Sequence, residues 1–153
     1  MASVSNIFLL ISNNSTANTR NVTVSGTMNF DMGEVGKSYR LEIKIFGEDR
    51  PGDNVPSNDP FGDDELYTFL WGRFLPQIPY KRFTVTTAGP QTFTETRAIS
   101  DDKLDEDSGK VQVGIADINT PIFMPRADEV YAKVVLSATP STARSNTVRT
   151  VGV

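Results

Sequence analysis

Apolar and polar residues alternate with period two along two long stretches of the chain. Between Asn21 and Phe30 the apolar side chains fall on even-numbered positions, and between Tyr39 and Ile45 they fall on odd-numbered positions. Such alternation predicts strands with one face in a core and one face in solvent. The connecting segment Asp31–Gly36 contains two glycines and predicts a turn.

The rest of the chain continues the strand pattern. Further strands are predicted over Val130–Leu136, Leu66–Phe74, Val111–Ile115, Arg82–Thr87, Phe93–Ile99 and Asn146–Val151. The run Ile7–Ser12 is apolar at successive positions, which predicts a strand covered on both faces. No stretch has an apolar stripe of helical period and length. We therefore expect an all-β chain that folds as one domain, residues 1–153, into an antiparallel β-sandwich of about eight strands.

Two segments place apolar side chains between prolines, Leu75–Pro79 and Pro121–Pro125. Proline cannot donate to a strand ladder, so both are expected at sheet edges or outside the sheets. They either cover an open end of the core or form an exposed apolar patch for a partner.

The composition excludes several classes of function. A net charge of -4 and a pI near 4.8 exclude the basic field on which nucleic-acid binding depends. Because the chain has no cysteine and no histidine, thiolate nucleophiles, serine–histidine catalysis and tetrahedral zinc sites are excluded. Only a carboxylate pair is left for hydrolysis, and neither Glu42 nor Glu95 has an identifiable partner. We therefore do not expect an enzyme.

Carboxylates are the main candidate chemistry. Of the nineteen acidic residues, seven lie between Glu48 and Glu65 and five between Asp101 and Asp107, in segments that connect predicted strands. Oxygen ligands crowded onto turns suit a hard cation, so calcium is the candidate ion. The spacing Asp105-x-Asp107-x-Gly109 is part of an EF-hand loop, but position twelve is Ala116, which rejects the EF-hand itself. The candidate metal ligands are Asp49, Asp53, Asp59, Asp63, Asp102, Asp105 and Asp107.

Two resemblances point to sandwich folds. Asp128-Glu-Val-Tyr-Ala-Lys-Val-Val-Leu136 and Ser145-Asn-Thr-Val148 resemble the last two strands of fibronectin type III and other immunoglobulin-like modules. That resemblance gives Tyr131 the role of the tyrosine that anchors a corner. Ser57-Asn-Asp-Pro-Phe61 resembles the segment after the first calcium loop of C2 domains, with Ile99–Asp107 as the second loop. C2 domains share calcium between two such loops and meet phospholipid there. The expected topology is therefore immunoglobulin-like or jelly-roll-like.

The leading interpretation is a non-catalytic structural or interaction module that self-assembles or binds other protein subunits, with acidic loops for calcium. The alternative is a calcium-dependent module that binds carbohydrate or lipid, lectin-like or C2-like, and a carboxylate-based hydrolase is the third. A membrane is not expected as a partner, since the start of the chain lacks a signal peptide pattern and no segment is long and apolar enough to span. These features fit the cytoplasm or an assembled particle and leave the compartment open.

Overall fold

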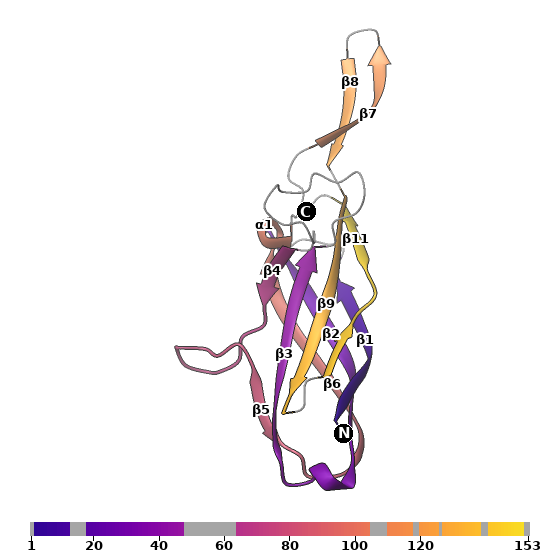
Figure 1. Ribbon diagram of the computed structural model, residues 1–153. Coiled ribbons are helices and arrows are strands. Elements are labelled where there is room, and N and C mark those ends of the chain that lie inside the picture. Colours follow the sequence, from indigo (N-terminus) through magenta and orange to yellow (C-terminus); the bar gives the residue numbers. More distant parts are fainter. Residues whose placement is uncertain are drawn as a thin grey trace.

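Two antiparallel sheets pack face to face as an all-β sandwich (Figure 1). The computed structural model describes residues 2–12, 18–47, 64–104, 110–117, 120–125, 127–138 and 141–151, with side chains for all of these except 110–128, 141–142 and 151. The first sheet, sheet A, has the order β1-β2-β6, with β1 at Ser3–Ile11, β2 at Thr19–Phe30 and β6 at Gly89–Ser100.

The second sheet, sheet B, has the order β10-β9-β3-β4. Its strands are β3 (Ser38–Gly47), β4 (Asp64–Thr68), β9 (Ala127–Ser137) and β10 (Ser141–Arg144). Two short strands extend its edges: β5 (Lys81–Thr84) pairs with β3, and β11 (Val148–Val151) pairs with β9. A separate two-stranded sheet is formed by β7 (Lys110–Asp117) and β8 (Thr120–Pro125).

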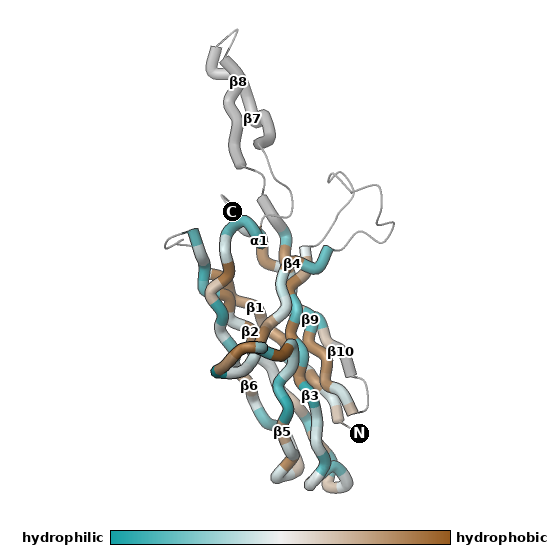
Figure 2. The backbone as a smooth tube through the Cα atoms, turned by 90° about the vertical axis from the view of Figure 1, so that its left-hand side faces the viewer, coloured by the Kyte–Doolittle hydropathy of each residue, from teal (hydrophilic) through white to brown (hydrophobic). Residues whose placement is uncertain are grey.

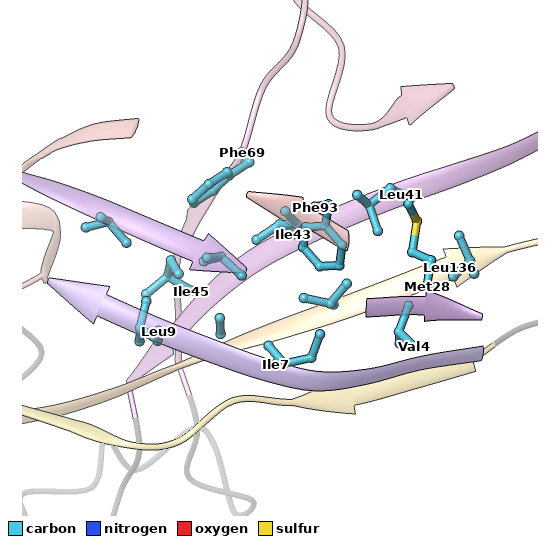
Figure 3. Close-up of a cluster of buried hydrophobic side chains, with 14 of the residues drawn as sticks. Val4, Ile7, Leu9, Met28, Leu41, Ile43, Ile45, Phe69, Phe93 and Leu136 are labelled. Carbon is cyan, nitrogen blue, oxygen red and sulfur yellow. The ribbon is translucent and has the colours of Figure 1, made fainter. Parts of the chain in front are cut away.

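The core lies between sheets A and B. The inward positions of β2, β3 and β9 are those that the alternation predicts, and their apolar side chains are almost completely buried. Phe69 and Phe93 fill the space between the two layers, as the close-up of the core shows (Figure 3). Burial of this continuous apolar cluster is the main favourable term in the stability of the sandwich.

The first strand differs from its prediction. Its buried positions are even-numbered up to Val4 and odd-numbered from Ile7 on, so Phe8 and Leu10 point outward with 54% and 58% of their surface exposed. A β-bulge causes this change, because the register jumps between Ser5 and Phe8. The prediction that the Ile7–Ser12 run is covered on both faces is therefore wrong.

Most of the other predicted strands are confirmed, with differences at their ends. The strand expected over Leu66–Phe74 ends at Thr68, and the one expected over Arg82–Thr87 ends at Thr84. The structure adds the short strand β10, a 3-10 turn at Met32–Glu34 and one turn of helix, α1, at Asp101–Leu104. Pro121–Pro125 lies in β8, outside both sheets of the sandwich, where a missing backbone donor is tolerated.

Candidate functional site

The described ends of the two acidic segments lie at the same end of the sandwich (Figure 1). The first, 48–65, lies between β3 and β4, and its last two residues, Asp64 and Glu65, open β4. The second starts with Asp101 and Asp102 in α1, which packs against β4 (Figure 1). The described ends of the two segments are therefore neighbours.

Six of the seven predicted metal ligands lie outside the described residues: Asp49, Asp53, Asp59, Asp63, Asp105 and Asp107. The seventh, Asp102, is exposed on α1. Within the described part of the chain, no three carboxylates come close enough together to hold a metal ion. The calcium site thus stays a prediction.

The described carboxylates next to Asp102 already have partners. Asp101 Oδ1 lies 3.2 Å from Arg20 Nε, and the two side chains are only 17% and 7% exposed. Glu65 lies 3.5 Å from Lys44 Nζ and accepts a hydrogen bond from Thr68 Oγ1 at 2.6 Å. These residues therefore stabilise the end of the sandwich, and cation ligands would have to come from elsewhere in the two acidic segments.

A shallow hollow of about 480 Å³ lies beside β4 and α1, lined by Glu65, Leu66, Tyr67, Thr68, Leu70 and Lys103. Lys103 Nζ lies 5.3 Å from the centre of the Tyr67 ring, in the range of a cation–π contact. An aromatic face flanked by an acid and a base is chemistry that can contact a sugar ring. Among the described residues of this end, the hollow is the feature that favours a ligand-binding function.

The two strand carboxylates considered for hydrolysis lie in different sheets. Glu42 is half-buried on β3. Glu95 on β6 lies 3.2 Å from Lys81 Nζ and 3.5 Å from Arg97 Nη1. Each of these contacts gives Glu95 a structural role on β6.

The outer face of sheet A carries no charge. The charged residues of β1, β2 and β6, three strands that are described in full, are Arg20, Glu95 and Arg97, and all have the inward parity. The outward positions form cross-strand rows of small polar residues with two large apolar side chains among them: Ser3–Asn29–Pro90, Ser5–Thr27–Thr92, Phe8–Ser25–Thr94 and Leu10–Thr23–Thr96. We call this surface the uncharged face.

Hydrogen bonds join neighbouring strands across the uncharged face. Thr23 Oγ1 and Thr96 Oγ1 are 2.9 Å apart, and Asn29 Nδ2 donates to Ser5 Oγ at 3.1 Å. Ordinary protein surfaces carry roughly 25–35% charged residues, so an entire face without one is unusual. In the sequence, the alternation Thr92-x-Thr94-x-Thr96 indicates an uncharged face on this one strand. That the face continues over three strands can be inferred only when it is known which strands lie side by side.

No protein-family model matches the sequence of the chain, and no curated protein is similar to it in sequence. In the described residues, no helix is long and apolar enough to cross a membrane.

Proposed function

We propose that the chain is a non-catalytic β-sandwich module that works by association, and that the uncharged face is the surface through which copies of the chain meet. The absence of charge on this face carries the proposal. The cores of protein interfaces are depleted in charged residues, because each charge must lose its water when the partner binds. A face that avoids charge over three strands is suited to that desolvation.

The chemistry of the uncharged face is also self-complementary. Serine and threonine hydroxyls and asparagine amides can each donate and accept hydrogen bonds, so two copies related by a two-fold axis can satisfy one another. Phe8 and Leu10 add two large apolar side chains on β1, along one edge of the face. Large apolar side chains next to small polar residues are typical anchors of an interface.

The size of the uncharged face is sufficient for a specific contact. Strands β2 and β6 are paired over their full length, and β1 adds a third strand. Standard strand dimensions make the face roughly 40 Å by 14 Å, on the order of 550 Å² per copy. Two copies would bury about 1,100 Å², which reaches the lower bound of about 1,000 Å² for a specific interface.

We further propose that the sandwich is immunoglobulin-like. The order β1-β2-β6 facing β10-β9-β3-β4 corresponds to strands A-B-E facing G-F-C with an added C′. The two segments that resemble the last strands of such modules fall on β9 and on the segment from Ser145 into β11. The guanidinium carbon of Arg144 lies 3.6 Å from the centre of the Tyr131 ring, and the same ring stacks on Phe46. These contacts support a packing role for Tyr131.

Calcium binding by the two acidic segments remains part of the proposal. The support is that their described ends meet at β4 and α1, so that any further carboxylates brought together there would repel one another. A cation would turn that repulsion into attraction. Millimolar calcium is therefore expected to raise the melting temperature, and identical melting curves in calcium and in chelator would remove calcium from the account.

The hollow beside β4 and α1 favours a second candidate function, calcium-dependent binding of a carbohydrate. A glycan array probed with and without chelator tests it. Calcium-dependent glycan binding that is lost in a Tyr67→Ala variant would make ligand recognition the main function.

Sedimentation velocity over a concentration series tests the association proposal. The expected result is a reversible shift to a dimer or larger species as the protein concentration rises. A strict monomer at the highest concentration would contradict it.

A further inference from the structure

A loop between β4 and β5, which we call the Trp71–Tyr80 loop, projects from the side of the sandwich (Figure 1). Trp71 and Ile78 exchange two backbone hydrogen bonds, of 2.8 and 2.9 Å, across its base. Gln77 Nε2 donates to the carbonyl oxygen of Gly72 at 3.0 Å, and Gly72 has φ +125°, which only glycine adopts easily. The loop therefore has a defined shape of its own.

The apex of the Trp71–Tyr80 loop is apolar and faces solvent. Phe74 is 83% exposed and Leu75 is 89% exposed, more than any other large hydrophobic side chain in the described part of the chain. A view from the side on which the loop projects shows hydrophobic, brown stretches along it (Figure 2). Large apolar side chains gathered at one exposed point mark a binding site more often than an ordinary surface.

The surroundings of this apex are cationic, although the chain as a whole is acidic. No aspartate or glutamate occurs between Glu65 and Glu95, whereas Arg73, Lys81 and Arg82 do. Arg82 lies directly opposite Arg40 across the β3–β5 pair. Like charges in that position repel.

Three of these cations are available to an outside anion. In the described structure Arg40, Arg73 and Arg82 form no ion pair with a carboxylate, whereas Lys81 is paired with Glu95 at 3.2 Å. The guanidinium of Arg40 lies over the Tyr80 ring at 4.5 Å, which leaves its charge uncompensated. The unpaired arginines thus lie in the loop itself and in the β3–β5 pair, where β5 directly follows the loop.

We propose that the Trp71–Tyr80 loop docks the module on the surface of an anionic phospholipid bilayer. Phe74 and Leu75 enter the boundary between headgroups and acyl chains, while Arg73 and Arg82 contact the anionic headgroups. The long side chain of Arg73 allows its charge to stay at the headgroups beside the inserted apex.

A bilayer fits this apex better than a protein partner does. Even a small specific protein interface needs about 500 Å² on each side, which two adjacent side chains at one turn cannot supply. A bilayer has no such minimum, since each inserted side chain contributes on its own. The cations belong to the protein, so this docking does not depend on calcium.

The proposed docking places a cluster of side chains on the surface of a membrane, and no spanning segment is involved. The expectation that a membrane is not a partner was based on the length of apolar runs and on the lack of a signal peptide pattern. Neither feature describes one cationic loop with an apolar apex. The proposed association through the uncharged face is independent of this docking.

Vesicle flotation tests the docking proposal with the full chain. The vesicles are pure phosphatidylcholine or a phosphatidylcholine–phosphatidylserine mixture, each in chelator and in calcium. Trp71, the chain's only tryptophan, stands at the base of the loop, so its emission provides a second readout. We expect flotation and a blue shift of that emission with the anionic vesicles in chelator.

Two matched double variants assign any binding to its surface. Phe74→Ser/Leu75→Ser should reduce the partition coefficient by at least about tenfold, since burial of one such side chain alone contributes about that factor. Phe8→Ser/Leu10→Ser removes the same kinds of side chain from the uncharged face and should leave partition unchanged. Both sets of side chains are exposed, so thermal melts should show folded proteins.

The outcomes separate the docking proposal from its rivals. No binding to anionic vesicles, binding only in calcium, or equal binding by the Phe74→Ser/Leu75→Ser variant would each overturn it. Loss of self-association in that variant would also overturn it, because the loop would then be a contact between proteins. Loss of vesicle binding with self-association intact supports the docking proposal and leaves the role of the uncharged face untouched.

Discussion

The side chain of Asn146 forms with the backbone of Leu9 the two hydrogen bonds that a neighbouring strand would otherwise form. Its Oδ1 accepts the Leu9 backbone N–H at 2.8 Å, and its Nδ2 donates to the Leu9 carbonyl at 3.3 Å. The two residues are 137 positions apart in sequence, and β1 is an edge strand of sheet A. One amide therefore ties the start of the chain to its last strands and closes the open edge at this point.

Replacement of Asn146 by alanine should lower the free energy of unfolding by about 1–3 kcal/mol, because the Leu9 N–H and carbonyl both lose their partner. Asn146→Asp keeps the acceptor for the Leu9 N–H but loses the donor to the Leu9 carbonyl. Comparison of the two variants therefore separates the contributions of the two hydrogen bonds to stability. Denaturant unfolding measures both variants, and hydrogen exchange at the Leu9 amide should accelerate in Asn146→Ala. Protection at Leu9 that is unchanged in the alanine variant would contradict this role.

Gly26 is required by the bulge in β1. It stands opposite Asn6 and Ile7, and a Cβ there would overlap the end of Ile7 and come within 2.9 Å of the Phe93 ring. Gly26→Ala should therefore destabilise the fold by about 1–3 kcal/mol through overpacking. Gly33→Ala is the control, because a Cβ at Gly33 meets nothing within 4 Å. Equal stability of the two variants would refute the packing argument.

Tyr39 should make the fold sensitive to high pH. Burial raises the pKa of Tyr39 above its usual value of 10.0, and the Glu34 carboxylate, which carries negative charge and a hydrogen bond from Tyr39, raises it further. The folded state then holds this proton more tightly than the unfolded state does. The contribution to stability is full below about pH 10 and is lost as the pH rises through the folded pKa.

The measurement is the free energy of unfolding against pH. Tyr39→Phe should lose about 1 kcal/mol at neutral pH, since Glu34 loses a donor, and its stability should decline less steeply above pH 10 than that of the unmodified chain. A Tyr39→Phe profile parallel to that of the unmodified chain would count against the assignment.

The ion pair between Arg20 and Asp101 should be structural. Asp101→Asn leaves the buried Arg20 guanidinium without its charged partner and is expected to cost about 2 kcal/mol. Asp102→Asn, next in sequence but exposed on α1, should change stability by less than about 0.5 kcal/mol. Thermal and denaturant unfolding provide the comparison. An Asp101→Asn variant as stable as the unmodified chain would show that the ion pair contributes nothing to stability.

The strands were predictable where one face is buried and the other is solvated. In β2, β3 and β9 the alternation alone identified the inward residues, because period two is fixed by strand geometry. The sequence could not place β1 correctly. Its successive apolar residues concealed a bulge that depends on Gly26 in another strand.

The candidate sites were less predictable than the fold. Prolines marked Leu75–Pro79 as unusual, but exposure of Phe74 and Leu75 depends on how Trp71 and Ile78 close the loop. The uncharged face requires knowledge that β6 lies beside β2, a pairing of segments about seventy residues apart. Of the acidic ligands named from the sequence, only Asp102 is in the described part of the chain, so that site remains a prediction.

The dissociation constant for self-association, measured by sedimentation velocity, tests the central claim most directly when a charge is placed on the uncharged face. Thr94→Lys puts an ammonium beside Ser25, in the same cross-strand row as Phe8, whereas Thr84→Lys puts the same charge on an exposed threonine of β5 in sheet B. The account predicts at least about tenfold weaker association for Thr94→Lys, because two copies would each have to desolvate that charge, and no change for Thr84→Lys. Equal association of the two variants, or association weakened only by Thr84→Lys, would contradict it.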